Sequence, residues 1–195
     1  MKILYSLPSV RVCGGVVHFF FFFKRLAERG HEVTIQSPEI LDLEVLPKLP
    51  DEIVVEKIPG VSSNLYTMPP ETRPIRYART LKDLTMGLKK IAQAIPEGTE
   101  VIHAGFHPNA KAALLALEKG WWKGKIVQAV HMDPETFIPE SFKKRYAFLF
   151  REVPYRVDHL LTVCEPLEQK LQRYGKPVTN VRNGVDPIYL ETPKT

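Results

Sequence analysis

Short runs rich in valine, isoleucine and leucine alternate with helical segments along the chain. Most of these runs lack the strict apolar–polar alternation of half-exposed strands, so they fit parallel strands covered on both faces. The predicted strands are Lys2–Leu7, Glu32–Ser37, Glu52–Ile58, Val101–Gly105, Lys125–Val130, His159–Val163 and Val178–Val181. Strands and helices in repeated succession predict an α/β fold, with a doubly wound, mostly parallel sheet of about seven strands and helices on both faces.

The clearest helix joins the third and fourth predicted strands. Its apolar residues recur at spacings of four and three, and lysines and an aspartate fall on the other face, which predicts an amphipathic helix packed on the sheet. These apolar residues are Tyr77, Leu81, Leu84, Leu88, Ile91 and Ile95. Two further helices, Pro108–Gly120 and 165–175, each have a proline near the start and a glycine at the end.

Five consecutive phenylalanines, Phe19–Phe23, lie between the first two predicted strands. The longest apolar run, Val16–Phe23, is interrupted by His18 and is far shorter than the roughly 20 residues needed to span a bilayer. A crossover helix lying against a sheet can be apolar nearly all round. We therefore expect a buried helix from Gly14 onward that ends at Gly30.

The charge balance and the cysteine count restrict the function further. A formal net charge of +5 is a mild basic excess that suits an anionic ligand or lipid surface, but it is no polybasic arm, so we expect no nucleic-acid partner. Cys13 and Cys164 are the only cysteines. This argues against a disulfide scaffold and against a zinc site or other metal, and favours a reducing, cytoplasmic location.

Ligands of open α/β sheets bind at the carboxyl ends of the strands. After the first predicted strand, Gly14 and Gly15 would let the backbone approach an anion, with the N–H groups of the following helix pointing at a phosphate. A plain tight turn explains the two glycines equally well. The G-x-G-x-x-G fingerprint of dinucleotide binding and the G-K-[ST] of a phosphate-binding loop are both missing from the sequence.

Histidines and acids stand at the same predicted edge. His103 and His107 bracket the end of the fourth predicted strand, where they would hydrogen-bond backbone or ligand rather than pair on a metal. His131 and Asp133 follow the fifth strand, one loop away from His107, and a histidine beside an acid there can orient a hydroxyl or transfer a proton. A purely structural role is the alternative for each of them.

Two later strand ends carry weaker signals. Glu165 follows the sixth predicted strand, where an acid favours a helix N-terminus by electrostatics alone. Asn183 and Gly184 follow the last strand and form a turn dipeptide.

Two segments suggest surface contacts. The segment Ser141–Arg151 mixes aromatic residues with Lys143, Lys144 and Arg145, as in a basic aromatic helix lying on anionic lipid. Trp121 and Trp122 add two aromatics in a predicted loop, as at membrane interfaces. An ordinary crossover helix with a core face and a solvated face is the alternative.

Five segments, in this order and spacing, resemble the N-terminal half of a family-4 retaining glycosyltransferase of the GT-B fold. They are "MKILYSLPS…GG…LAERGHEVTI", "EVIHAGFHPNAKAALLA", "IVQAVHMD", "VDHLLTVCEPLEQKLQRYG" and "VTNVRNGVD". The resemblance runs from Met1 to about Asp186 and is weakest between Ser37 and Glu97. It implies a Rossmann-like domain that faces a second such domain across a cleft.

The resemblance also implies roles for single residues. Gly14 and Gly15 match the loop that approaches the donor diphosphate, and His131 matches the cleft histidine that contacts the transferred sugar. His107 lies where acceptor-side polar residues are found, and the loops from His103 onward, with Asp133, would shape the acceptor side. Glu165 matches the acid of the family's "SE" pair, with Cys164 in place of the serine. The hinge segment would contain Asn183, Gly184 and Asp186.

The resemblance further implies an organisation for the whole protein. Residues 1–186 would form the acceptor-side domain and residues 187–195 the start of the interdomain linker, with the donor-binding domain outside this chain. The expected donor substrate is a nucleoside-diphosphate sugar, the acceptor a sugar or lipid, and no further cofactor is needed. The fragment alone would be inactive, in the cytoplasm or at the inner face of the membrane. A non-catalytic binding module of the same fold is the alternative.

Overall fold

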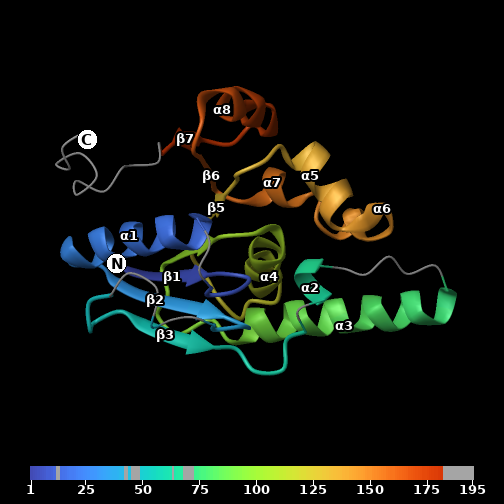
Figure 1. The fold of residues 1–195 in the computed structure, drawn as a ribbon, viewed down its shortest axis with the longest axis horizontal. Coiled ribbons are helices and arrows are strands. Elements are labelled where there is room, and N and C mark those ends of the chain that lie inside the picture. The colour runs from blue at the N-terminus through green and yellow to red at the C-terminus, as the bar shows by residue number, and fades with distance from the viewer. Residues whose placement is uncertain (12–13, 42–43, 45–48, 63, 68–72, 182–195) are drawn as a thin grey trace, which may run out of the picture.

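The computed structural model describes residues 1–11, 14–41, 44, 49–62, 64–67 and 73–181. Within these residues the chain forms one parallel sheet in the order β3-β2-β1-β4-β5-β6-β7 (Figure 1). The strands are β1 (Lys2–Ser6), β2 (Glu32–Ser37), β3 (Val54–Lys57), β4 (Val101–Ala104), β5 (Lys125–Ala129), β6 (His159–Thr162) and β7 (Val178–Asn180). The seven predicted strands and their parallel arrangement are therefore confirmed.

The strand order reverses next to β1. Ile3 pairs with Val33 of β2 on one side and with Val101 of β4 on the other. Successive strands are added away from β1 in both directions, so the connections after β1 and after β4 leave toward opposite faces of the sheet. The carboxyl ends of these two strands are the topological switch point, where ligands of this architecture bind.

Helices cover both faces of the sheet. They are α1 (Gly14–Glu28), α2 (Asn64–Thr67), α3 (Pro74–Gln93), α4 (His107–Glu118), α5 (Pro134–Ser141), α6 (Lys143–Tyr146), α7 (Val153–Arg156) and α8 (Glu165–Leu171), with the 3₁₀ turns η2 (Ala147–Leu149) and η3 (Gln172–Tyr174). Figure 1 shows α1 on one face and α3 and α4 on the other. The predicted helices of residues 77–95, 108–120 and 165–175 thus all exist, with slightly different ends.

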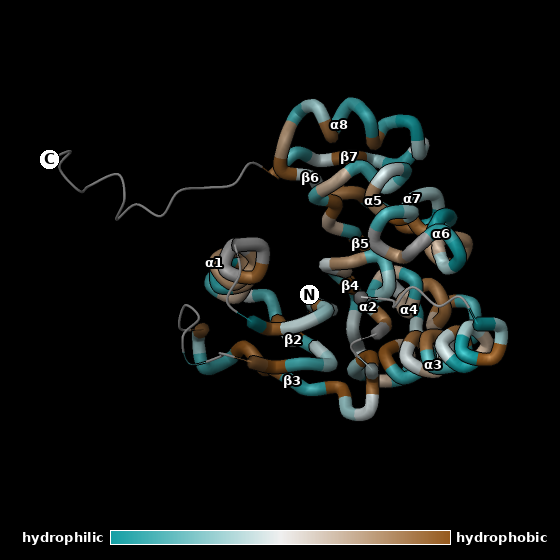
Figure 2. The backbone as a smooth tube through the Cα atoms, turned by 45° about the vertical axis from the view of Figure 1, so that its right-hand side comes forward, coloured by the Kyte–Doolittle hydropathy of each residue, from teal (hydrophilic) through white to brown (hydrophobic). Residues whose placement is uncertain are grey.

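Two buried clusters follow from the alternation of side chains along each strand. In β1, Tyr5 points toward α1 and packs in a cluster with Phe20 and Phe23. Its neighbour Leu4 points to the other face and joins a larger cluster with residues of α3 and α4, among them Leu88. In Figure 2 hydrophobic and hydrophilic residues alternate along the coil of α3, as expected for an amphipathic helix with one face packed on the domain.

The phenylalanine run forms the middle of α1, as predicted. Phe19, Phe20 and Phe23 are buried, whereas Phe21 is 43% exposed. The helix ends at Glu28, and Gly30 follows with a positive φ of 78°, the left-handed geometry that favours glycine after a helix.

The segment 141–151 does not form the single basic aromatic helix that the sequence predicts. It is broken into the end of α5, the short α6 and the turn η2. The rings of Phe142 and Phe150 lie 4.5 Å apart and both are buried. Residues eight apart in a straight helix are separated by about 12 Å along its axis, so the break is what brings these two rings together.

Trp122 is also placed differently from the prediction. Its indole is 7% exposed and donates a hydrogen bond of 2.7 Å to the carbonyl of Thr99, so it belongs to the core and not to a membrane-facing loop. Trp121 is exposed. The distinction depends on a carbonyl that lies 23 residues away in the sequence, which a local pattern does not reveal.

Gly124 lies against Trp122, and a side chain there has no room. A Cβ on Gly124 would collide with the carbonyl oxygen of Glu100 and with the indole of Trp122. We expect Gly124→Ala to lower the free energy of unfolding by about 1–3 kcal/mol, measured by urea denaturation. Gly87→Ala in α3 is the control: its Cβ meets only ordinary contacts at 3.5 Å and beyond, so it should stabilise the helix by up to about 1 kcal/mol. Equal effects of the two variants would contradict this packing.

Candidate functional site

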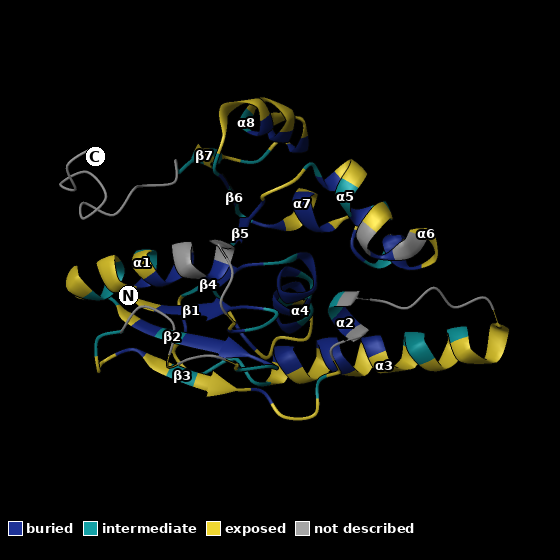
Figure 3. Ribbon diagram, viewed as in Figure 1, coloured by how far each residue is buried: buried dark blue, intermediate teal, exposed yellow. Residues whose placement is uncertain are grey.

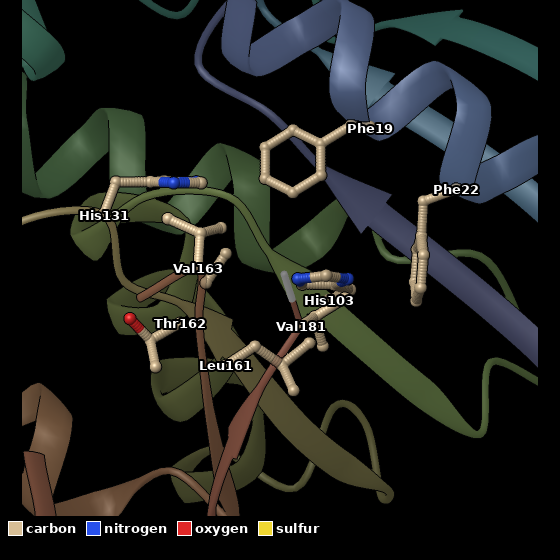
Figure 4. A pocket seen from close by; sticks show the side chains of 9 residues that line it. Phe19, Phe22, His103, His131, Leu161, Thr162, Val163 and Val181 are labelled. Atoms are coloured by element: carbon tan, nitrogen blue, oxygen red, sulfur yellow. The ribbon is translucent and has the colours of Figure 1, made fainter. Parts of the chain in front are cut away.

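A small pocket lies between α1 and the carboxyl-terminal parts of the central strands (Figure 4). It is lined by Phe19, Phe22, His103, Ala129, His131, Leu161, Thr162, Val163 and Val181. Its volume of about 20 Å³ is room for about one water molecule, so a larger ligand would contact it from outside. The lining is mostly apolar, with His103, His131 and Thr162 as its polar members.

His131 lies at the exposed rim of this pocket. The strand β5 ends at Ala129, and the following N–H of Val130 donates to the carbonyl of Leu161, which fixes where the loop leaves the sheet. The imidazole of His131 meets the ring of Phe19 edge to face, with the ring centres 5.6 Å apart. An exposed imidazole held in this way can contact a ligand that approaches the carboxyl edge of the sheet.

His103 lies deeper on the same side. It is a residue of β4 and faces α1, because its strand neighbours Ile102 and Ala104 belong to the cluster on the opposite face. Its ring centre is 4.2 Å from that of Tyr5 and 5.6 Å from that of Phe19. Figure 4 shows the rings of His103 and His131 on either side of Phe19. The fold therefore brings together two histidines that are 28 residues apart in the sequence.

His107 does not join them. It is the first residue of α4, is only 3% exposed, and its ring lies 6.0 Å from those of Phe106 and Phe137. Burial lowers the pKa of His107 to about 3, so the imidazole is neutral at physiological pH. Neither of its nitrogens has a hydrogen-bond partner among the described residues. The structure places His107 in the core, away from the pocket lining.

The burial of His107 predicts a specific loss of stability in acid. In the unfolded chain a histidine has a pKa of about 6.5, whereas burial lowers the pKa of folded His107 to about 3. Between these values the unfolded state binds a proton that the folded state does not, so stability falls as the pH is lowered, by up to about 1.4 kcal/mol per pH unit. His107→Leu should remove this part of the slope in urea denaturation between pH 7 and pH 4. Parallel pH profiles for the two proteins would contradict the buried neutral state.

A buried polar cluster next to His107 was not predicted. The side-chain amide of Asn109 donates to the hydroxyl of Ser6, at 2.8 Å, and to the hydroxyl of Tyr66, at 3.2 Å. Burial raises the pKa of Tyr66, so the phenol stays protonated. These bonds join the end of β1, the start of α4 and the short α2. Sequence spacing does not indicate the cluster, because its members are up to 103 residues apart.

Asp133 and Glu165 lie at the N-termini of two helices. The carboxylate of Asp133 accepts from the N–H of Glu135 as the N-cap of α5 and forms ion pairs with Lys170 and Arg173. It thereby joins α5 to the α8–η3 segment. Glu165 is the exposed first residue of α8, where a negative charge favours the helix N-terminus. Neither residue lines the pocket with His131.

Gly14 and Gly15 are the first two residues of α1. Their helical geometry excludes a turn with positive φ, which is one of the two explanations from the sequence. The N–H groups of a first helical turn have no partner within the helix and carry its positive end, so they can hydrogen-bond an anion. The predicted hinge residues Asn183, Gly184 and Asp186 lie outside the described residues.

Two features are absent from the described residues. No group of three His, Cys, Asp or Glu side chains among them gathers closely enough to hold a metal ion. None of their helices combines the length and the apolar character that crossing a membrane requires.

The parallel sheet, its switch point and the pocket beside the first helix define a Rossmann-like domain. The sequence profile of Glycosyltransferase Family 4 matches residues 12–188. The chain therefore belongs to this family, and the resemblance seen in the sequence is confirmed. No curated protein matches the chain in sequence.

Solved structures share the fold at low sequence identity. Sucrose-phosphate synthase from Thermosynechococcus elongatus is 10% identical, with a TM-score of 0.60, and the match covers 98% of this chain and 53% of that one. A UDP-glucosyltransferase from Polygonum tinctorium is 13% identical, with a TM-score of 0.61, and the match covers 100% of this chain and 54% of that one. A glycosyltransferase from Rickettsia africae is 19% identical, with a TM-score of 0.58, and the match covers 97% of this chain and 45% of that one. The chain thus spans about half the length of the enzymes it matches.

Proposed function

We propose that this domain forms the acceptor side of a cleft in which a retaining glycosyltransferase transfers a sugar from a nucleoside-diphosphate donor. The observation that carries the proposal is the meeting of two features at one edge of the sheet. The glycine-led N-terminus of α1 and the exposed imidazole of His131 both belong to the carboxyl edge, beside the pocket that Phe19 shares with His103.

In this proposal each of the two features contacts a different part of the donor. The N–H groups of Gly14 and Gly15 approach the diphosphate, since no side chain stands between their backbone and the anion. His131 contacts the transferred sugar and stabilises the charge that develops on it as the bond to the diphosphate breaks. The imidazole acts by orientation and polarity, not as a covalent nucleophile.

The remaining parts of the active site would come from elsewhere. The chain spans about half of the enzymes it matches, and a pocket of about 20 Å³ is too small to enclose a sugar. We infer that a second domain of the complete protein binds the nucleotide, that the acceptor is a sugar or lipid held between the two domains, and that residues 1–195 alone do not transfer sugar. Cytoplasmic nucleotide sugars would supply the donor, with no added cofactor.

Gly15→Ala separates a donor role from a structural one. Alanine is the better helix former, so the variant should be at least as stable as the natural protein. The added methyl group would stand where the diphosphate approaches, and we expect the KM of the complete protein for its nucleotide sugar to rise by about tenfold or more, because one charge-assisted hydrogen bond is worth about 1.5–3 kcal/mol. The measurement is steady-state kinetics beside a thermal melt. An unchanged KM would remove the glycines from the donor site.

A further inference from the structure

The N-terminal half of α3 projects beyond the rest of the domain (Figure 1). Its C-terminal half packs on the sheet through Leu84, Leu88 and Ile91, all buried. The half that begins at Pro74 is mostly exposed, as Figure 3 shows. In Figure 1 the arrows of β1, β2 and β3 point toward this projecting end, and the sheet is parallel, so the projecting end lies at the carboxyl edge of the sheet, the edge that also carries His131.

The projecting half is strongly cationic. Between residues 73 and 82 there are four basic residues and no acidic one: Arg73, Arg76, Arg79 and Lys82. Their spacing of three places successive members next to each other on the helix surface. Arg76, Arg79 and Lys82 are exposed. Among the described residues none of these three forms an ion pair.

A second cationic segment lies against the first. Residues 141–151 carry four basic residues and again no acidic one: Lys143, Lys144, Arg145 and Arg151. The hydroxyl of Tyr77 in α3 donates to the carbonyl of Arg145, at 3.3 Å. The rings of Tyr77 and Tyr146 stack with centres 5.1 Å apart and planes at 20°. Two segments that are far apart in the sequence therefore form one surface, which we call the cationic face.

Large apolar side chains stand among these cations. Ile75, in the first turn of α3, is 79% exposed, and Phe148, in η2, is 55% exposed. Single exposed apolar residues are ordinary on protein surfaces. Here each lies in a segment free of acidic residues, and the combination of cations with exposed isoleucine and phenylalanine is typical of surfaces that insert shallowly into anionic membranes.

We propose that the cationic face docks the protein on an anionic lipid bilayer. Lysine and arginine next to such a surface each strengthen binding by about fivefold, and Ile75 and Phe148 enter the boundary between headgroups and acyl chains. A purely ionic partner such as a nucleic acid would use the charges but gain nothing from the two apolar side chains. The docking does not rest on sugar transfer, although it would turn the carboxyl edge of the sheet toward the membrane.

The face differs from the surface that the sequence suggests. Trp122 is buried, and Trp121 lies between α4 and β5, at the amino ends of the strands. This is the edge opposite the projecting end of α3, so Trp121 and the cationic face would not contact one flat bilayer together. Lys144 and Arg145 are retained from the prediction, and the cations of α3 are new.

The test is cosedimentation of the complete protein with phosphatidylcholine vesicles, with and without phosphatidylglycerol. We expect binding only to the anionic vesicles, weakening as salt is raised. Combining Arg76→Glu, Arg79→Glu and Lys144→Glu should lower the partition coefficient by at least about 100-fold. The control combines Lys24→Glu, Lys119→Glu and Lys123→Glu, which changes the net charge equally at exposed positions elsewhere and should change binding by less than about twofold to threefold, since long-range effects are screened.

A second pair of variants separates lipid from other polyanions. Ile75→Ser with Phe148→Ser keeps every charge and should weaken vesicle binding by about tenfold while leaving heparin binding unchanged. Both side chains are largely exposed, so the fold should tolerate the change. Equal binding to neutral vesicles, equal losses in the control triple variant, or no loss with the apolar pair would each overturn the proposal.

Discussion

Replacing Phe23 by alanine is expected to lower the free energy of unfolding by about 3–5 kcal/mol, one of the largest effects of any single change in this chain. The side chain is fully buried, and its ring centre lies 3.7 Å from that of Tyr5 and 5.8 Å from that of Phe20. Alanine would leave a cavity between α1 and the sheet, because strand and helix backbones cannot close in to fill it. Urea denaturation measures the loss.

Phe21→Ala is the matched control, since it removes the same side chain from the same helix. Phe21 is 43% exposed, and alanine is the better helix former, so the two effects nearly cancel and stability should change by less than about 1 kcal/mol. If both variants lose stability equally, the phenylalanine run does not bury one face as the structure has it. If neither does, α1 is not part of the core.

The second large effect concerns activity. In the complete protein, His131→Ala should lower kcat by about 100- to 1000-fold, the loss seen when one group that stabilises transition-state charge is removed. Because the imidazole is exposed at the pocket rim, the variant should keep the melting temperature of the natural protein. Steady-state kinetics and a thermal melt on the same preparation distinguish a chemical role from a folding defect.

Met132→Ala provides the comparison for this variant. Met132 is the next residue along the loop, is exposed, and does not line the pocket, so its removal should leave kcat within about twofold, as is usual for surface substitutions away from a site. Full turnover in His131→Ala would remove the histidine from the reaction. A similar loss in both variants would assign the effect to the loop as a whole.

The fold could be predicted almost completely from the sequence, because buried parallel strands and amphipathic crossover helices have strong local patterns. The segment Glu32–Ser37 is β2 with the predicted ends, and five other strands end one residue earlier than predicted. The strand β3 begins two residues later and ends one residue earlier than predicted. The phenylalanine run was placed correctly by its length and by its position between two strands. The helix breaks in residues 141–151 were missed, because they bring together the rings of Phe142 and Phe150, whose spacing of eight residues also fits an unbroken helix.

The site was only partly predictable. Position at a strand end identified His103, His107 and His131, but it does not tell on which face of the sheet each ring lies. His103 and His131 meet through Phe19, a residue of the buried run, whereas His107 is covered by Phe137 of α5. The helix that covers a given strand end is determined by packing between distant segments, which a local sequence pattern does not reveal.

For Asp133, too, proximity in the sequence suggests a role that differs from its position in the structure. Beside His131 in the sequence it suggests a partner for proton transfer, yet its carboxylate caps α5 and pairs with Lys170 and Arg173 from a helical segment that is more than 30 residues away. Aspartate before a proline at a helix start is a common capping pattern, and this signal was available in the sequence.

The most direct test of the proposed function is the release of nucleoside diphosphate by the complete protein from a panel of uridine-, guanosine- and adenosine-diphosphate sugars. Candidate sugar and lipid acceptors are supplied, and the anomeric configuration of any product is read by NMR. We expect turnover of at least one donor with retained configuration, and none by residues 1–195 alone. Absence of turnover with every donor in a folded complete protein, or an inverted product, would contradict it.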